Sequence, residues 1–404
     1  MDPVVVVGAG MAGGRAFDVF RKSSTTPVLL VGDEPHRPYH RPELSKRFLL
    51  DGSCDSSIFF HPPEHYARGH ANFLASSRAV ALEPDVHLLT LADGTVLTYS
   101  KLLIATGGTP RTMDVPGTQL EGIHYLRSLE DARILRETLS TRRRLAVIGA
   151  GLVGLEVAAA ASGFGLEVTV VDVCQLPFPR LGEELGQRLV RLHEDHGVRF
   201  LLGTTVVRFT GDTRIEGVEL DNGTILAADA AIIGIGIVPD TVWLAPVLAG
   251  RLVKGTVAVD ELGRTGLPDV YAVGDVTTWS HPYFGPVHSE HETVAQNHGM
   301  RIASGLVRDA KPFAMVPYAW SDQYDHELRT VGIADVTLSD DVTIVEGHAG
   351  AVAALYLRER DILGAAALDW SGFVARVSKA MQSQLPLPCD SSLVRALVSD
   401  PPTP

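Results

Sequence analysis

The sequence has few cysteines, no excess of positive charge and no long apolar run, and each absence excludes a class of protein. The three cysteines, Cys54, Cys174 and Cys389, are far apart in 404 residues and form no CxxC pair. This spacing argues against a zinc site, a disulfide framework and a dithiol redox centre, and favours reduced thiols. The formal net charge of −13 argues against a nucleic acid or an anionic membrane as partner.

The chain also lacks the features of an exported or membrane protein. No apolar run reaches the length of a membrane span, and the first strand begins at Val4 without a basic, cleavable leader. We therefore expect a cytoplasmic protein. A length of 404 residues allows two or three domains with hydrophobic cores, and 39 glycines suit an α/β protein with many tight turns.

The first motif follows a buried β-branched strand, Val4–Val7. The loop reads Gly8-Ala-Gly10-Met11-Ala12-Gly13, and helical periodicity continues after it. In a GxGxxG loop the glycines allow a tight turn and close approach of backbone to a pyrophosphate, which lies at the helix N-terminus. A second strand ends in Asp33-Glu34, 21 residues after Gly13, where a carboxylate should bind ribose hydroxyls. This unit predicts a dinucleotide site.

The same unit recurs 141 residues later. The strand Arg144–Ile148 leads into Gly149-Ala-Gly151-Leu152-Val153-Gly154, then an Ala-rich helix and a strand closed by Asp172. Two complete copies predict two nucleotides, one held and one exchanged. Asp172 favours a free 2′-hydroxyl and thus NADH over NADPH, although the nearby Arg180 keeps NADPH open.

Three further segments predict which loop holds the flavin. The strand from Lys101 ends in Ala105-Thr106-Gly107, a similar strand ends in Gly234-Ile235-Gly236, and Tyr271-Ala-Val-Gly274-Asp275 follows. In two-dinucleotide flavoproteins an aspartate at this last position hydrogen-bonds the ribityl chain. The order predicts FAD on the N-terminal loop, in a discontinuous domain of residues 1–110 and 236–314, with an NAD(H)-binding domain, 111–235, inserted.

Several motifs together resemble the FAD-dependent pyridine-nucleotide:ferredoxin reductases, the oxygenase-coupled type that includes the putidaredoxin, rubredoxin and biphenyl-dioxygenase ferredoxin reductases. The resemblance covers about residues 4–385. The motifs that carry it are Pro38-Tyr-His-Arg41-Pro-Glu-Leu-Ser-Lys46, Ala105–Arg111, Gly149–Glu156, Tyr271–Asp275 and Trp320-Ser-Asp-Gln-Tyr-Asp325. It implies an α/β fold of glutathione-reductase-like architecture, with two Rossmann-like domains and a C-terminal α+β interface domain, 315–404. The last residues, 401–404, read Pro-Pro-Thr-Pro and are predicted to form a short disordered tail.

The resemblance also implies roles for single residues. Arg41 and Lys46 would lie near the flavin and its phosphates, with Lys46 at the N5 or O4 edge; Glu156 would lie near the nicotinamide, and Trp320 at the flavin's pyrimidine end. We take Lys46 and Glu156 as candidate catalytic residues. The cofactor-binding set is completed by Val80, Arg111, Glu290, Glu292, Thr293 and Ala295.

The sequence departs from the family pattern at a few positions. Glu43 replaces a usual proline, and Glu292 stands where a tryptophan is common, a position that bears on nicotinamide access or electron exit. The spacing of His281, His288, His291 and His298 allows shared helix faces, but without a suitable ligand set we predict no metal. Residues 301–404 hold nine Lys and Arg against thirteen Asp and Glu, so only a local patch of Arg301, Arg308 and Lys311 could steer an acidic carrier.

These observations predict hydride transfer from NADH to FAD, followed by electron transfer to a [2Fe-2S] ferredoxin that serves an oxygenase or P450. Two alternatives remain open. The flavoenzyme could use another acceptor, such as oxygen, a quinone or a small organic substrate. It could also be an NADH-responsive regulatory flavoprotein that resembles apoptosis-inducing factor. The chain is expected to be a monomer or homodimer.

Overall fold

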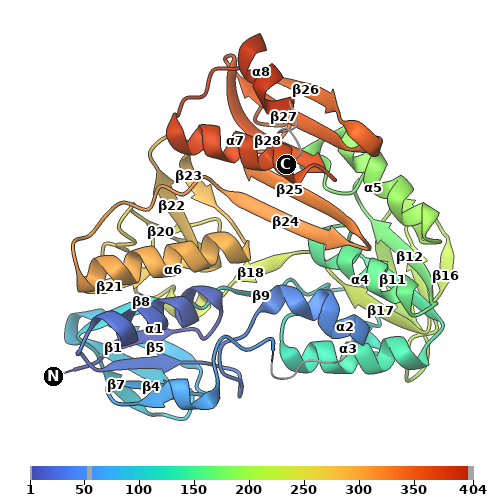
Figure 1. Cartoon of the computed structure of the whole chain (residues 1–404). Helices are drawn as coiled ribbons and strands as arrows, with labels where there is room; N and C mark the ends of the chain where they lie inside the picture. The colour runs from blue at the N-terminus through green and yellow to red at the C-terminus, as the bar shows by residue number, and fades with distance from the viewer. Residues whose placement is uncertain (1, 52–56, 399–404) are drawn as a thin grey trace. The chain divides into compact units, whose positions relative to one another are not determined.

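The computed structural model describes residues 2–51 and 57–398, and these form two compact units. Unit 1 comprises Met1–Pro42, Cys54–Thr109 and Ile237–Met315; unit 2 comprises Glu43–Ser53, Pro110–Gly236 and Val316–Pro404. Figure 1 shows this interleaving by colour, since the dark blue segment before residue 43 and the light orange segment at about 270–310 belong to the same unit. Cys54 and the predicted tail at 401–404 lie outside the described residues.

A six-stranded sheet is the centre of unit 1. Its order is β21 (Val270–Ala272), β8 (Lys101–Ile104), β1 (Val4–Val7), β2 (Val28–Val31), β4 (Ala71–Leu74) and β3 (Ala67–Arg68). All neighbours are parallel except β3 and β4. Val5 and Val6 are fully buried, as expected for a parallel strand covered on both faces.

The register of this sheet brings four chain segments to one edge. Val7 pairs with Val31 and Ile104, and Ile104 pairs with Ala272. Because the carboxyl ends of parallel strands meet at one edge, the segments that follow these strands lie close together. Two helices of this unit, α1 (Met11–Ser23) and α6 (Glu292–Val307), lie side by side in Figure 1. A Cβ on Gly299 would lie 2.2 Å from the backbone oxygen of Ala12, so glycine permits this close helix contact.

Smaller sheets complete unit 1. One is three-stranded and antiparallel, and another has four strands that include the segment after Asp275. Their bounds are β5 (Ala79–Glu83), β6 (Leu88–Leu91), β7 (Val96–Thr98), β19 (Leu252–Val253), β20 (Thr256–Val259), β22 (Thr277–His281) and β23 (Gly285–His288). The strands β9 (Gly108–Pro110) and β18 (Ile237–Pro239) pair where the chain leaves and re-enters unit 1.

Unit 2 contains a second parallel sheet. Its order is β10 (Ile123–His124), β17 (Ala230–Ile233), β11 (Arg144–Ile148), β12 (Glu167–Asp172) and β13 (Arg199–Leu202). The helices α2 (Arg47–Asp51), α3 (Leu129–Thr141) and α4 (Leu152–Gly163) belong to this unit, and Leu49 of α2 is fully buried in its core. A three-stranded sheet, β14 (Val206–Thr210), β15 (Gly217–Leu220) and β16 (Ile225–Ala227), packs in a separate hydrophobic cluster with residues of β11, β12 and β17.

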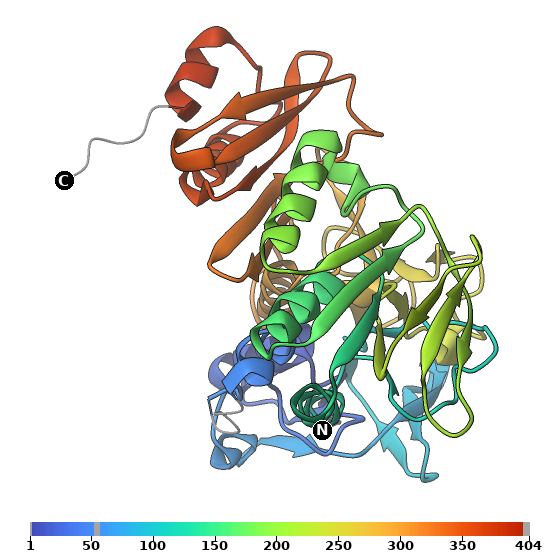
Figure 2. The ribbon, with the colours of Figure 1, turned by 90° about the vertical axis from the view of Figure 1, so that its right-hand side faces the viewer.

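The C-terminal part of unit 2 is an antiparallel sheet. Its order is β24 (Tyr318–Gln323), β25 (His326–Gly332), β28 (Asp361–Leu368), β27 (Val352–Arg358) and β26 (Asp341–Glu346). The helix α7 (Ser371–Ser383) packs on it, followed by α8 (Ser391–Val398). The helix α5 (Glu183–Asp195) shares a buried cluster with this sheet and lies beside it in Figure 2.

The expected fold class is confirmed: two parallel α/β sheets are followed by an antiparallel C-terminal sheet with helices. The strands predicted at Val4–Val7 and Arg144–Ile148 have the predicted bounds. Among the described helices, none combines the length and the hydropathy needed to cross a bilayer.

Candidate functional site

The first glycine loop, in unit 1, is shaped by close backbone packing. Gly8 has a φ of +108°, and a Cβ there would lie 2.2 Å from the backbone oxygen of Ala105. A Cβ on Gly13 would lie 1.9 Å from the oxygen of Gly8. Side chains are thus excluded at both positions, which fixes the turn between β1 and α1.

Gly10 is different, because its missing Cβ points into open space. The nearest described atom is Nε of Arg41, at 4.0 Å. Within the described part of the chain, α1 has no side-chain cap on its first backbone N–H groups and no acidic residue in its first turn. An uncapped helix N-terminus with a guanidinium beside it fits a pyrophosphate.

Glu34 holds Arg41 in this position. Its two carboxylate oxygens accept hydrogen bonds from Arg41 Nη2 and from the Tyr39 hydroxyl, each at 2.5 Å. Burial lowers the pKa of Arg41, but Tyr39, Glu34 and Asp275 raise it more, so the net shift is upward. The other predicted acid, Asp33, is more exposed and pairs with Arg78 at 2.6 Å.

The segments after β8 and β21, which contain Thr106-Gly107 and Gly274-Asp275, lie at the same edge of the sheet as the first glycine loop. The Thr106 hydroxyl donates to the backbone oxygen of Asp240 at 3.0 Å, and Gly107 has a φ of +65°. At the turn before Asp275, the backbone N–H of Gly274 donates to Nδ1 of the buried His298 at 3.2 Å. Met11 and Ala12 form the first turn of α1, whereas Val80, in β5, is 40% exposed.

The second loop, in unit 2, repeats the first in its packing. Gly149 has a φ of +106° and a Cβ there would lie 2.4 Å from the oxygen of Gly234; for Gly154 the distance to the oxygen of Gly149 is 2.0 Å. Apart from Gly151 itself and its two chain neighbours, no described residue places an atom within 4 Å of a Cβ built on Gly151. The next residues, Leu152 and Val153, begin α4, which in the described residues has neither a side-chain cap nor an acid in its first turn. This loop also fits a nucleotide diphosphate.

Asp172 lies at the end of β12 beside this loop. Its Oδ2 accepts from the backbone N–H of Ala150 at 2.6 Å, and its Oδ1 accepts from that of Cys174 at 2.7 Å. A carboxylate offers about four lone-pair positions, so these two bonds leave capacity for ribose hydroxyls. Arg180 is 80% exposed and lies 3.6 Å from Asp335.

The strand end at β17 supplies the remaining small residues of this site. Gly234 follows the strand and Gly236 has a φ of +96°, with Ile235 between them. The backbone N–H of Arg111 donates to the oxygen of Gly236 at 2.9 Å. The predicted residues Gly234, Ile235, Gly236 and Arg111 are therefore neighbours in unit 2.

A buried polar cluster in unit 2 contains both candidate catalytic residues. Glu156, on α4, is 6% exposed and forms an ion pair with Lys46 at 3.2 Å. The hydroxyls of Ser45 and Ser321 donate to its two oxygens at 2.5 and 2.6 Å. The ammonium of Lys46 also lies 3.7 Å from the ring centre of Trp320, a cation–π contact.

Burial and the neighbouring groups have opposite effects on the pKa of Glu156. Burial raises the pKa of Glu156, while Lys46 and the two serine hydroxyls lower it, and the net shift is upward. We attribute the direction to burial, because a carboxylate at 6% exposure loses most of its hydration. The cluster thus holds a lysine charge and a carboxyl group with an increased tendency to take up a proton. The roles of Ser45 and Ser321 were not predicted, although both lie inside the quoted motifs.

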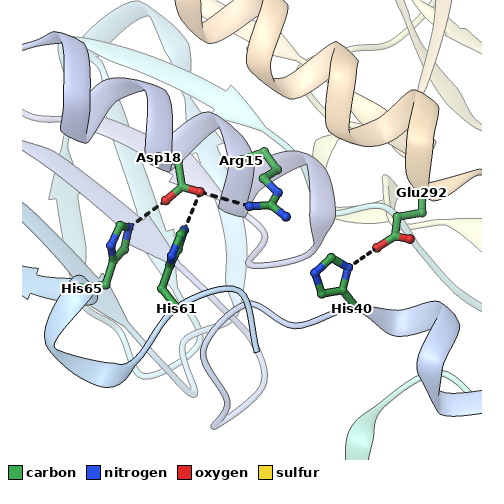
Figure 3. A network of polar contacts seen from close by, with 6 residues as sticks. All are labelled: Arg15, Asp18, His40, His61, His65 and Glu292. Carbon is green, nitrogen blue, oxygen red and sulfur yellow. Dashed lines mark hydrogen bonds and ion pairs between the residues drawn. The ribbon is translucent and has the colours of Figure 1, made fainter. Parts of the chain in front are cut away.

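Glu292, which departs from the family pattern, has a partner in unit 1. It begins α6, and its Oε1 lies 2.7 Å from Nδ1 of His40. Figure 3 shows this pair bridging the α6 terminus and the segment before Arg41. Glu290 pairs instead with His288 at 3.1 Å, Thr293 lies in the first turn of α6, and Ala295 is buried.

The four clustered histidines have separate partners. His281 accepts from the backbone of Tyr283 and Phe284, His288 contacts Thr277 and Glu290, and His298 accepts from Gly274, while His291 is the N-cap of α6. The described residues contain one group with metal-ligand geometry, and it includes none of these four. Of the cysteines, Cys174 and Cys389 are free thiols.

Comparison with known proteins places this geometry in a family. Residues 2–299 match the model "Pyridine nucleotide-disulphide oxidoreductase", and residues 318–393 match "Reductase C-terminal". The ferredoxin–NAD(+) reductase component of the anthranilate 1,2-dioxygenase system of Burkholderia cepacia is 37% identical over 338 residues, 82% of each chain. Rhodocoxin reductase of Rhodococcus erythropolis is 34% identical over 348 residues, 85% of this chain and 80% of that protein. The crystal structure of the ferredoxin reductase for the CYP199A2 system of Rhodopseudomonas palustris aligns with a TM-score of 0.91 at 29% identity, covering 98% of this chain and 100% of that one.

Proposed function

Because this chain belongs to the pyridine nucleotide-disulphide oxidoreductase family and carries its reductase C-terminal domain, we propose that it passes electrons from NADH through FAD to a [2Fe-2S] ferredoxin. Membership makes the chain an NAD(P)H-dependent flavoprotein oxidoreductase. The absence of a CxxC pair separates it from family members that reduce disulfides. FAD, when bound, accepts a hydride from a reduced nicotinamide and releases electrons one at a time.

The observation that carries the proposal is the repeated loop. In each copy a side chain on the first or third glycine would collide with backbone atoms, whereas the middle glycine faces open space. The helix that follows has no side-chain cap at its N-terminus. We assign FAD to the loop at Gly8 in unit 1, with a domain near 1–110 and 236–314, and NADH to the loop at Gly149, within 111–235. The domain near 315–404 would meet the carrier.

The proposed roles of single residues follow from their contacts. Arg41 is held by Glu34 beside Gly10, which suits a cation that binds the FAD diphosphate. Asp275 would bind the ribityl hydroxyls. Lys46 and Glu156 would set the charge next to the bound redox groups, with Trp320 holding the lysine in place.

The preference for NADH rests on Asp172. A carboxylate at the end of β12 attracts the 2′-hydroxyl of NADH and repels a 2′-phosphate. Arg180, which could neutralise such a phosphate, lies near Asp335. This arrangement favours NADH.

The proposal is tested with the purified holoenzyme and a purified [2Fe-2S] ferredoxin. After anaerobic bleaching of the flavin by NADH, we expect cytochrome c to be reduced rapidly when the ferredoxin is present and slowly when it is absent. Rapid peroxide formation in air without a carrier would instead favour oxygen as the acceptor. Replacement of Asp275 by Ala should cause loss of FAD during purification, whereas Asp269→Ala, six residues away at a half-exposed aspartate, should retain it.

A further inference from the structure

A second polar cluster in unit 1 shares no residue with the first glycine loop. Asp18 of α1 faces His61, which precedes the short 3₁₀ turn Pro63–Tyr66, and His65, which lies within that turn. One oxygen of Asp18 lies 2.8 Å from Nε2 of His61, and the other lies 2.7 Å from Nε2 of His65. Figure 3 shows both imidazoles pointing at the carboxylate.

The geometry of this cluster is that of a ligand set. The three donor atoms, one from each residue, lie within 4.8 Å of one another. The two imidazole rings are stacked with their centres 3.8 Å apart, and the Nε2 atom of each contacts the Asp18 carboxylate. Ligand distances at zinc are about 2.0–2.2 Å for histidine and carboxylate, so small side-chain shifts would let the three atoms surround one ion. We propose that Asp18, His61 and His65 bind a divalent transition-metal ion, with Zn²⁺ as the best match.

The choice of metal follows from the donor types. Two imidazoles and one carboxylate suit Zn²⁺ and its neighbours in the first row, whereas Ca²⁺ and Mg²⁺ prefer sets made of oxygen alone. The Asp18 side chain is 9% exposed and that of His61 is 25% exposed, so the carboxylate is held inside while one ligand borders solvent. Three protein ligands leave a fourth position for water.

The positive charges around the cluster are the main argument against a metal. Arg15 lies 3.5 Å from the Asp18 carboxylate, and the charge of Arg21 acts on His65. The contact with Arg15 is long, however, and its guanidinium packs on the ring of Phe60 at 4.2 Å. The imidazoles are therefore the close partners of Asp18, and a metal ion would replace their two hydrogen bonds to the carboxylate together with the weak contact with Arg15.

The expected consequence is a link between two segments of unit 1. The ion would join α1, which begins at the first glycine loop, to the turn at 61–65, more than 40 residues later in the sequence. Because a metal that binds only the folded state stabilises it, Zn²⁺ should raise the thermal unfolding temperature of the protein.

The test uses tag-free FAD-loaded protein, first stripped of metal, and Zn²⁺ in competition with a chromophoric chelator. We expect one competing site per chain, and a loss of affinity of about tenfold or more in His61→Gln and in His65→Gln. His326→Gln is the matched control. His326 also contacts a carboxylate, that of Asp369, at 2.6 Å, but it does not belong to the described group with metal-ligand geometry. Zn²⁺ should raise the unfolding temperature of the wild type and of His326→Gln, and not that of His61→Gln.

Two results would overturn the proposal. One is Zn²⁺ binding that His61→Gln and His65→Gln leave unchanged, which would place the metal at other histidines. The other is wild-type protein that does not compete with the chelator at all, which would make the cluster a hydrogen-bond network. Both His variants keep an amide that can hydrogen-bond Asp18, so folded protein is expected for each measurement.

Discussion

The buried ion pair between Lys46 and Glu156 makes a quantitative prediction about stability. At 3.2 Å, two unit charges attract by about 5 kcal/mol if the effective dielectric constant is about 20. Loss of hydration offsets much of this, but removal of one partner leaves the other charge buried, at a cost of about 3–5 kcal/mol. Lys46→Met and Glu156→Gln should each show such a loss in the free energy of unfolding.

A double-mutant cycle isolates the pair. The amide of Glu156→Gln keeps an oxygen for one serine and an NH₂ for the other, so this change removes the charge and preserves the contacts with Ser45 and Ser321. The double variant leaves no buried charge of the pair. It should therefore be more stable than the sum of the single losses predicts, with a coupling of about 2–3 kcal/mol.

The ion pair of Lys101 with Asp269 is the matched control. Its distance is 3.3 Å, close to the 3.2 Å of the buried pair, but its side chains are 35% and 39% exposed, against 15% and 6%. Exposed pairs contribute about 0.2–1 kcal/mol, so the same cycle at Lys101 and Asp269 should give a coupling below about 1 kcal/mol. Both cycles are measured by urea unfolding of the holoenzyme at pH 8, followed by far-UV circular dichroism.

The pH dependence gives the prediction a second, independent readout. Burial raises the pKa of Glu156 in the folded state above its value in the unfolded state. Between these two pKa values the folded state binds more protons than the unfolded state, so the free energy of unfolding falls as the pH rises through this range. In Lys46→Met the carboxyl group loses its cation, which raises this pKa further. Lys46→Met should thus be less destabilised at pH 5 than at pH 8. Equal losses at both pH values, or couplings that do not differ between the two ion pairs, would refute the reasoning.

Three further predictions concern nucleotide choice, the carrier and acid stability. Asp172→Asn keeps an oxygen that accepts the hydrogen bond from the loop backbone but removes the negative charge. The ratio of kcat/KM for NADH to kcat/KM for NADPH should therefore fall by about tenfold. An unchanged ratio would show that Asp172 does not contact the ribose of the bound nucleotide. Glu292→Gln removes a negative charge, so at low ionic strength the KM for an acidic ferredoxin should fall a few-fold, and this effect should vanish in high salt. Burial lowers the pKa of His193 from 6.5 to about 4 in the folded state. Between these pH values the unfolded state binds more protons, so acidification to pH 4 should lower the free energy of unfolding by about 3 kcal/mol. Urea unfolding of His193→Gln should show a smaller loss over the same range.

The sequence predicts those parts of the site that depend on local backbone geometry. Gly8 and Gly149 are recognisable because a strand, a turn without side chains and a helix follow one another in a short segment. The register of parallel strands then explains why Gly274, far along the chain, reaches the same edge as Gly8. Local pattern and sheet topology are sufficient for this level of description.

Contacts between distant side chains are not encoded in such patterns. Glu156 stands out as an acid in an Ala-rich helix, but its hydrogen bond to Ser321, in strand β24, joins residues 165 positions apart. His40 and Glu292 are separated by 252 positions. His61 and His65 form an H-x₃-H pattern in the sequence, but only the fold brings Asp18 to these two histidines. Side-chain partners of this kind require the tertiary structure.

The two glycine loops share one backbone design but differ in what lies beside it. At the first loop, Arg41 is fixed by Glu34 next to Gly10, so a bound diphosphate would gain a charge-assisted contact from a cation already in position. At the second loop, the acid Asp172 is bonded to the loop backbone itself, and apart from Gly151 and its two chain neighbours no described residue places an atom within 4 Å of a Cβ built on Gly151. A preorganised cation slows dissociation, whereas a loop with only backbone donors favours exchange. This asymmetry is what a flavoprotein needs if it retains FAD while NADH binds and leaves in every cycle.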